Sequence, residues 1–112
     1  MKEDTIVTDS PIGKRLNVSR DTKQALLFGN KTIPLVSKIT IGRDSSNDIS
    51  INNQLCSRRH AVIQKIKDGF FISDLGSTNG TYINGSRIKA DQWIRLKRGD
   101  VITVGKAEII MN

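Results

Sequence analysis

Apolar and polar residues alternate along most of this chain in short runs, each ended after a few positions by turn-forming residues. A period of two places successive side chains on opposite faces of an extended strand, so each run predicts a β-strand with a buried face. No segment shows a sustained helical period with capping residues. The predicted strands cover residues 25–28, 33–36, 38–41, 61–67, 70–75, 81–83, 86–88, 93–97, 101–104 and 107–111.

Two pairs of these strands are separated by residues that favour two-residue hairpin turns. One such pair of residues is Asp68-Gly69 and the other is Asn84-Gly85. Both dipeptides tolerate the positive φ that these turns require. Many short strands with no long helix between them indicate an all-β domain, either an antiparallel sandwich or a barrel.

The beginning of the chain differs in composition from the rest. Residues 1–22 carry few large apolar side chains and are expected to form a flexible polar leader. Residues 15–19 could add a short strand there, and Thr5 or Thr8, which lie near acidic residues, could be phosphorylated and bind the protein's own site or a neighbour's. Residues 23–112 then form one domain, long enough to bury a core without a disulfide or a metal ion.

The composition is that of an ordinary folded domain with an excess of positive charge. Hydrophobic residues make up 37% of the 112, and 18 Lys and Arg against 11 Asp and Glu give a formal net charge of +7. This charge favours anionic partners in general, although the basic residues are scattered rather than gathered in a run. The single cysteine, Cys56, is expected to be a half-exposed, ordinary thiol. We expect no metal and no cofactor.

Three polar loops interrupt the strand pattern and carry the side chains best suited to bind an anion. They are residues 42–48, 57–60 and 76–81, with the sequences GRDSSND, SRRH and GSTNGT. Together they supply guanidinium groups, hydroxyls, a carboxamide and backbone N–H groups. Arginine forms bidentate, charge-assisted hydrogen bonds with phosphate, and two arginines nearly neutralise a phosphate monoester. The loops therefore predict a phosphate-binding site.

The same blocks resemble the signature of the forkhead-associated (FHA) domain. Gly42-Arg43, then SRRHA from Ser57, then LGSTNGTYING from Leu75, follow one another in the order and at the separations usual in that family, within residues 24–112. The resemblance implies a twisted sandwich of two antiparallel sheets with about 10 or 11 short strands and the binding loops at one end. It also implies a non-catalytic module that recognises phosphothreonine peptides for signalling or assembly.

The resemblance also implies roles for the residues that match the signature by position. Arg43 would clamp the phosphate, Ser57 would donate its hydroxyl to a phosphate oxygen, and Arg58 would add a second charge. Thr78 would contribute a hydroxyl or its backbone N–H, and Asn79 would hold the peptide main chain beside the phosphothreonine. The family prefers phosphothreonine to phosphoserine because the extra methyl occupies a small apolar pocket.

Other residues near these blocks are expected to support or border the site. Gly42, His60 and Gly80 would brace the loops, and no Ser or Asp partner arrangement makes His60 a catalytic base. Leu55 and Gln54 would form a specificity rim. In some family members, a basic side chain at the position of Leu55 selects an acidic peptide residue three positions after the phosphothreonine. This chain has a leucine there, so it is expected to favour an apolar residue at that peptide position.

Three residues that could suggest a ligand contact have simpler interpretations. Arg59 is expected to be a surface charge, and Asn84 to serve its hairpin turn. Trp93 is expected to pack on its strand rather than to stack on a ligand.

Three alternative functions compete with this interpretation. The charge favours a nucleic-acid-binding module, but aromatic residues are only 4% and no recognition helix is evident. The glycine-rich segment 76–80 could suggest a nucleotide-binding enzyme, but it lacks the ending of a P-loop and precedes a strand. The fold could also bind an unphosphorylated partner, although the complete set of phosphate-binding residues argues against this.

We therefore expect the partner to be a phosphothreonine-containing protein, either the substrate of a Ser/Thr kinase or the kinase itself. The expected location is intracellular, in the cytoplasm or in the nucleus of a eukaryote, since one thiol and no secretory signal favour a reducing compartment. No nucleic-acid partner and no membrane insertion are expected, because no apolar stretch reaches the length of a span. The sequence does not specify an oligomeric state.

Overall fold

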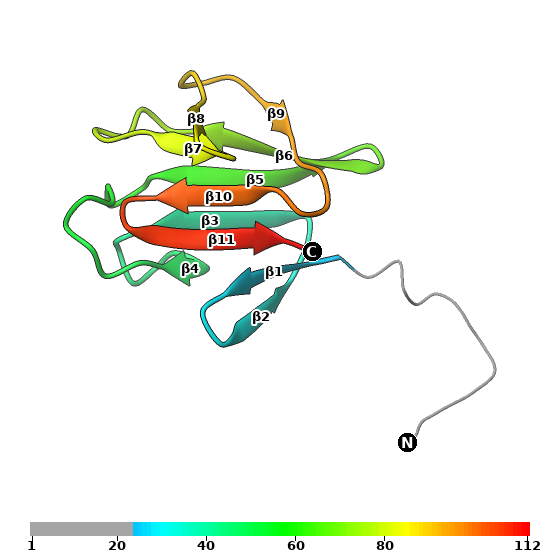
Figure 1. Ribbon diagram of the computed structural model, residues 1–112, viewed down its shortest axis with the longest axis horizontal. Helices are drawn as coiled ribbons and strands as arrows, with labels where there is room; N and C mark the ends of the chain where they lie inside the picture. The colour runs from blue at the N-terminus through cyan, green and yellow to red at the C-terminus, as the bar shows by residue number, and fades with distance from the viewer. Residues whose placement is uncertain (1–23) are drawn as a thin grey trace.

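The computed structural model describes residues 24–112, which form eleven strands and no helix (Figure 1). The expected leader, the strand at 15–19 and the threonines Thr5 and Thr8 lie outside the described residues. The strands are β1 (Ala25–Phe28), β2 (Lys31–Pro34), β3 (Lys38–Gly42), β4 (Ile49–Ser50), β5 (Ala61–Ile66), β6 (Gly69–Asp74), β7 (Thr81–Ile83), β8 (Ser86–Arg87), β9 (Ile94–Arg95), β10 (Val101–Val104) and β11 (Ala107–Met111).

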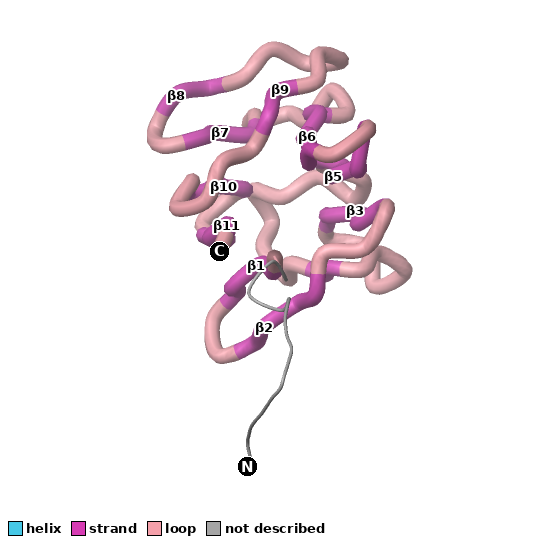
Figure 2. The backbone as a smooth tube through the Cα atoms, turned by 90° about the vertical axis from the view of Figure 1, so that its right-hand side faces the viewer, coloured by secondary structure: helices cyan, strands magenta, loops and turns pink. Residues whose placement is uncertain are grey.

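The strands form two sheets that face each other as layers of a sandwich (Figure 2). One sheet has six strands in the order β2-β1-β11-β10-β7-β8, and the other has five in the order β4-β3-β5-β6-β9. The all-β sandwich expected from the strand pattern and the resemblance is therefore confirmed, and the barrel is excluded.

One pair of strands departs from the expected antiparallel arrangement, because β4 runs parallel to β3. The chain after β3 turns back far enough for Asp48 to reach Thr40, whose N–H donates to the Asp48 carboxylate over 2.8 Å. It then advances again in the direction of β3, so that Ile49 lies beside Ile41. The short strand β4 was missed because two residues are too few to show an alternating pattern.

The core lies between the sheets and is built from their inward-facing aliphatic side chains. In the five-stranded sheet, Ile39, Ile63 and Ile72 are paired across β3, β5 and β6 and are fully buried. Ile102 and Ile109 are likewise paired across β10 and β11 of the other sheet and are fully buried. Because alternate residues of each strand point inward, both sheets contribute to one apolar cluster between them. This close-packed core fixes the strand ends from which the loops emerge.

Several strand boundaries differ from the sequence prediction, and two of these differences follow from the hydrogen-bonded pairing of the strands. The β1–β2 pairing continues to Phe28 and Lys31 beside the Gly29-Asn30 turn, so β2 begins two residues earlier than its apolar residues suggest. In the β5–β6 hairpin, Ile66 pairs with Gly69, and the turn is one residue earlier than predicted.

The second hairpin turn is formed as predicted. Asn84 and Gly85 both have positive φ, 51° and 86°, which is the conformation of a type I′ turn. The Asn84 side chain also accepts from the N–H of Val101 and donates to Asp100. It therefore serves this turn and ties it to β10, in line with its expected role.

Candidate functional site

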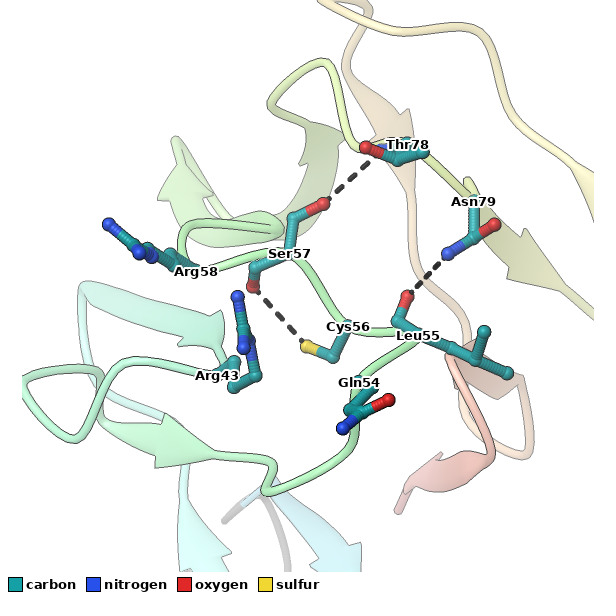
Figure 3. A pocket seen from close by; sticks show the side chains of 8 residues that line it. All are labelled: Arg43, Gln54, Leu55, Cys56, Ser57, Arg58, Thr78 and Asn79. Carbon is teal, nitrogen blue, oxygen red and sulfur yellow. Dashed lines mark hydrogen bonds between the residues drawn. The ribbon is translucent and has the colours of Figure 1, made fainter.

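The three polar loops meet at one end of the sandwich, where they line one open depression of about 390 Å³ (Figure 3). Gly42 ends β3 and Arg43 follows it, residues 54–58 lie between β4 and β5, and residues 78–79 lie between β6 and β7. The depression therefore combines residues that are up to 36 positions apart in the chain. Its lining consists of Arg43, Gln54, Leu55, Cys56, Ser57, Arg58, Thr78 and Asn79.

Two arginines make this depression positively charged. The backbone N–H of Arg43 donates to the Ser57 carbonyl over 2.9 Å, and the next N–H, of Asp44, donates to the Arg58 carbonyl over 3.3 Å. These two bonds lock the loop of Arg43 against the loop of Arg58. Among residues 24–112 neither guanidinium group forms an ion pair, so both are available to an anion from outside.

Ser57 and Thr78 are coupled across the depression. The backbone N–H of Thr78 donates to the Ser57 hydroxyl oxygen over 3.2 Å. Because Ser57 accepts this bond, its own hydroxyl proton remains free to donate to a ligand. The Thr78 N–H is occupied, which leaves the Thr78 hydroxyl as the group that can reach an anion.

Asn79 and the adjoining rim border the depression on the side away from Arg43 and Arg58 (Figure 3). The Asn79 side-chain amide donates to the Leu55 carbonyl over 3.0 Å, which fixes its orientation and leaves its own oxygen free to accept (Figure 3). The Leu55 side chain is 42% exposed, and Gln54 is also exposed. The rim therefore offers an apolar surface and a neutral amide, with no charge of its own.

His60 lies beneath the depression and contacts two of its loops. The backbone N–H of Ser57 donates to His60 Nδ1 over 3.0 Å. Nδ1 must therefore accept, so the ring proton lies on Nε2 and is donated to the Gly80 carbonyl over 2.8 Å. The ring is fully buried, with Asp74 3.9 Å from Nε2. Both ring nitrogens hold loop backbone, and neither faces the depression.

Asp74 organises a buried polar cluster behind the β6–β7 loop, and it was missed in the sequence. Its carboxylate accepts from the hydroxyls of Ser77 and Thr81 over 2.6 and 2.7 Å, and from two backbone N–H groups, those of Gly76 and Ser77. Burial opposes ionisation of this carboxyl, but the hydrogen bonds outweigh burial, so the pKa of Asp74 lies below its usual value. The sequence did contain a signal for this role, because Asp74 is an acidic residue at the end of the otherwise apolar strand β6, in register with the buried Ile72.

Gly42 and Gly80 occupy positions that a larger side chain could not share. A Cβ atom on Gly42 would overlap the Arg58 carbonyl and the side chain of Asn47. Asn47, which the sequence showed only as a loop residue, donates to the Arg58 carbonyl and to that of Asp44, both over 2.8 Å. Gly80 has a φ of 88°, in the left-handed region that favours glycine.

The expectation of a half-exposed thiol at Cys56 is wrong. The side chain is 1% exposed and belongs to the apolar core, although the residue borders the depression. Burial raises the pKa of the Cys56 thiol, and the nearby charge of Arg43 offsets this only in part. The thiol is therefore protonated at neutral pH and is a weak nucleophile.

Two of the remaining residues are placed as follows. Arg59 is exposed and does not line the depression. Trp93, which was expected to pack on its strand, precedes β9 and is 44% exposed, because β9 is only two residues long and does not include it. Among residues 24–112, no cluster of His, Cys, Asp and Glu is arranged to hold a metal ion, and no helix is long and apolar enough to cross a membrane.

The family comparison identifies the class of domain. The model of the FHA domain matches residues 39–105, which is more than half of the chain and includes all three loops. The chain therefore belongs to the FHA domain family.

Individual relatives show the same domain within longer proteins. An ABC transporter ATP-binding/permease protein of Mycobacterium tuberculosis is 40% identical over 72 residues, which is 64% of this chain but 8% of that protein. The oxoglutarate dehydrogenase inhibitor of Corynebacterium diphtheriae is 34% identical over 71 residues, or 63% of this chain and 48% of that protein. The chain thus spans less than half the length of these curated relatives.

A solved structure agrees with these comparisons. Mycobacterium tuberculosis EmbR in complex with a low-affinity phosphopeptide is 30% identical and superimposes with a TM-score of 0.74, covering 80% of this chain and 24% of that one.

Proposed function

We propose that this chain is a non-catalytic module that binds phosphothreonine peptides of a partner protein. The observation that carries the proposal is the depression that places Arg43, Arg58 and the free hydroxyl proton of Ser57 around one space. A phosphate monoester has about two negative charges at neutral pH, which matches two guanidinium groups that form no ion pair within residues 24–112. Membership of the FHA family and the phosphopeptide bound to EmbR support the same ligand class.

The phosphate would bind on a site that is already formed. Arg43 and Arg58 would provide bidentate, charge-assisted hydrogen bonds, and Ser57 would donate its hydroxyl to a phosphate oxygen. The loops that carry them are held by the backbone bonds at Ser57 and Arg58 and by His60 beneath. Such preorganisation lowers the entropy lost on binding.

Asn79 and the rim would read the peptide around the phosphothreonine. The free oxygen of Asn79 is suited to accept a main-chain N–H of the peptide. Leu55, with Gln54 beside it, favours an apolar residue three positions after the phosphothreonine, because neither side chain carries a charge to pair with an acid. Thr78 would contribute its hydroxyl, since its N–H is already bound to Ser57.

The geometry supports binding rather than turnover of the phosphate. The lining of the depression contains no histidine or carboxylate that could act as a general acid or base. Asp44, which follows Arg43, lines an adjoining hollow and accepts from the Ser46 N–H, and both ring nitrogens of His60 are engaged with backbone groups.

A phosphothreonine peptide as ligand also indicates the class of partner protein. We infer a phosphothreonine-containing protein that is a Ser/Thr kinase substrate or the kinase itself, met inside the cell, with no requirement for nucleic acid. The domain of residues 23–112 would bind this partner, and residues 1–22 would form a polar leader.

The experiment that tests the site is the exchange of Arg43 for alanine. Loss of one partner of a desolvated charge pair costs about 2 kcal/mol or more, so Arg43→Ala should weaken binding of phosphothreonine peptides at least about 30-fold. Binding is measured with an oriented phosphothreonine peptide library and then by fluorescence anisotropy with a selected peptide. Arg59→Ala is the matched control, because Arg59 is an exposed arginine outside the depression.

Unchanged far-ultraviolet circular dichroism should show that Arg43→Ala still folds. The proposed site is wrong if this folded variant binds the library as well as the wild type does. Clear hydrolysis of a phosphopeptide by the wild-type chain would refute the non-catalytic assignment.

A further inference from the structure

The end of the sandwich opposite the depression carries a second positively charged surface. β5 runs from the site, where it follows His60, to the β5–β6 hairpin, which projects from the domain at the right of Figure 1. We call this surface the basic tip and define it by the following six residues. They are Val36, Lys38, Lys65, Ile66, Lys67 and Arg95, from the β2–β3 connection, β3, the β5–β6 hairpin and β9.

Two exposed aliphatic side chains lie together at the centre of the basic tip. Lys38 pairs with Gln64, and the Lys65 N–H donates to the Ser37 carbonyl over 2.9 Å. Continuing this register places Val36 opposite Ile66, on the same face of the sheet. Val36 is 56% exposed, the highest value among the exposed large hydrophobic residues of residues 24–112, and Ile66 is 37% exposed.

Cations lie on both faces of the sheet around this aliphatic pair. Lys38, two residues after Val36, and Arg95, which pairs with Phe71, share the face of the aliphatic pair. Lys65 precedes Ile66 and projects from the opposite face, and Lys67 follows in the turn. The Arg95 guanidinium extends over the Phe71 ring, 5.8 Å from its centre, and close to Gly69, which pairs with Ile66. None of these four cations forms an ion pair within the described part of the chain. Asp68, in the hairpin turn, is the acidic residue beside them.

We propose that the basic tip is a peripheral docking surface for membranes that contain anionic lipids. Lysine and arginine are attracted to anionic headgroups, while small aliphatic side chains between them can enter the interfacial region. The β5–β6 hairpin projects from the domain (Figure 1), and a projecting hairpin is better shaped to press into a lipid interface than to enclose a peptide. Aliphatic side chains have no partner on a nucleic-acid backbone, and the aromatic ring at the tip, that of Phe71, is half-buried with Arg95 over it.

This contact would orient the phosphate site away from the membrane. The tip and the depression are at opposite ends of β5, so both surfaces can be occupied at once. The inference is independent of the proposed function, because it uses none of the residues that line the depression.

Vesicle binding by the full 112-residue chain tests the proposal. The probes are phosphatidylcholine vesicles with and without phosphatidylserine, and co-sedimentation measures the bound fraction. We expect binding only to vesicles with phosphatidylserine. Each basic residue near an anionic membrane contributes roughly fivefold to binding, so the double variant Lys65→Glu and Lys67→Glu should lose more than about tenfold in affinity. Val36→Ser with Ile66→Ser should also weaken binding severalfold while leaving the charge unchanged.

The matched control is Lys31→Glu with Lys89→Glu, which changes the net charge equally at exposed positions outside the tip. It should lose clearly less affinity than the tip variant. The proposal is overturned if wild type ignores phosphatidylserine vesicles, if the control loses as much as the tip variant, or if the serine variant binds like wild type. Binding of duplex DNA in preference to vesicles, with no effect of the serine variant, would assign the tip to nucleic acid instead. Unchanged far-ultraviolet circular dichroism should show that all variants fold.

Discussion

Asp74 is the single side chain on which the β6–β7 loop depends most. It is 3% exposed, and its two oxygens accept from two hydroxyls and two backbone N–H groups. Ser77, one of those partners, in turn accepts from the Gly80 N–H over 2.9 Å. The loop that presents Thr78 and Asn79 is therefore held in place by one ionised carboxylate.

The depressed pKa of Asp74 leads to a prediction for stability in acid. Its ionised form is favoured by folding, so its stabilising contribution is complete above the unfolded pKa, about 3.9, and is lost as the pH falls through the lower folded value. Asp74→Asn should lower the free energy of unfolding at neutral pH by about 1–3 kcal/mol, because hydroxyl donors lose acceptors. It should also flatten the pH dependence below pH about 4. Urea unfolding at several pH values measures both effects.

The exposed carboxylate of Asp68 provides the comparison for this prediction. Asp68→Asn should change the free energy of unfolding at neutral pH by less than about 0.5 kcal/mol. Equal effects of the two substitutions would contradict the special position of Asp74.

The β5–β6 hairpin has a local strain that follows from its register. The turn residue Lys67 has a φ of 59°, a left-handed conformation that costs a non-glycine residue about 1–2 kcal/mol. Lys67→Gly removes this cost but increases the entropy of the unfolded chain, so we expect a net stabilisation of about 0.5–1 kcal/mol. The denaturant midpoint should rise while the slope of unfolding with denaturant stays constant.

The neighbouring turn residue tests whether φ is the cause. Asp68 is not among the residues with positive φ, so Asp68→Gly should destabilise the domain through the entropy term alone. A destabilisation by both glycine substitutions would show that the hairpin is not strained at Lys67.

Over the domain as a whole, the excess of positive charge should act on the rate of peptide binding. A net charge of +7 attracts a phosphopeptide at long range, and salt screens this attraction over about 10 Å at 0.1 M. Raising the salt concentration should therefore lower the association rate constant more than it raises the dissociation rate constant. Stopped-flow fluorescence with a labelled phosphothreonine peptide measures both constants. An effect confined to dissociation would show that only the contacts in the depression matter.

Much of the fold could be predicted from local patterns in the sequence. The strands at 101–104 and 107–111 and the Asn84-Gly85 turn were predicted correctly, because alternation and turn chemistry depend on residues close in the chain. The three polar loops were found for the same reason, and they line one depression. The roles of Arg43 and Ser57 toward phosphate remain predictions that the alanine variant tests.

Contacts between distant segments decided the rest. The short strand β4 exists because Asp48 reaches back to Thr40, and Cys56 is buried because the β10–β11 turn, with Gly105 close to the Cys56 backbone, packs on its loop. No local pattern reports such contacts, since burial and loop bracing depend on which strands become neighbours. The sequence thus specified which side chains could bind a phosphate, while the packing of the two sheets decided that they surround one open space, with the basic tip at the other end.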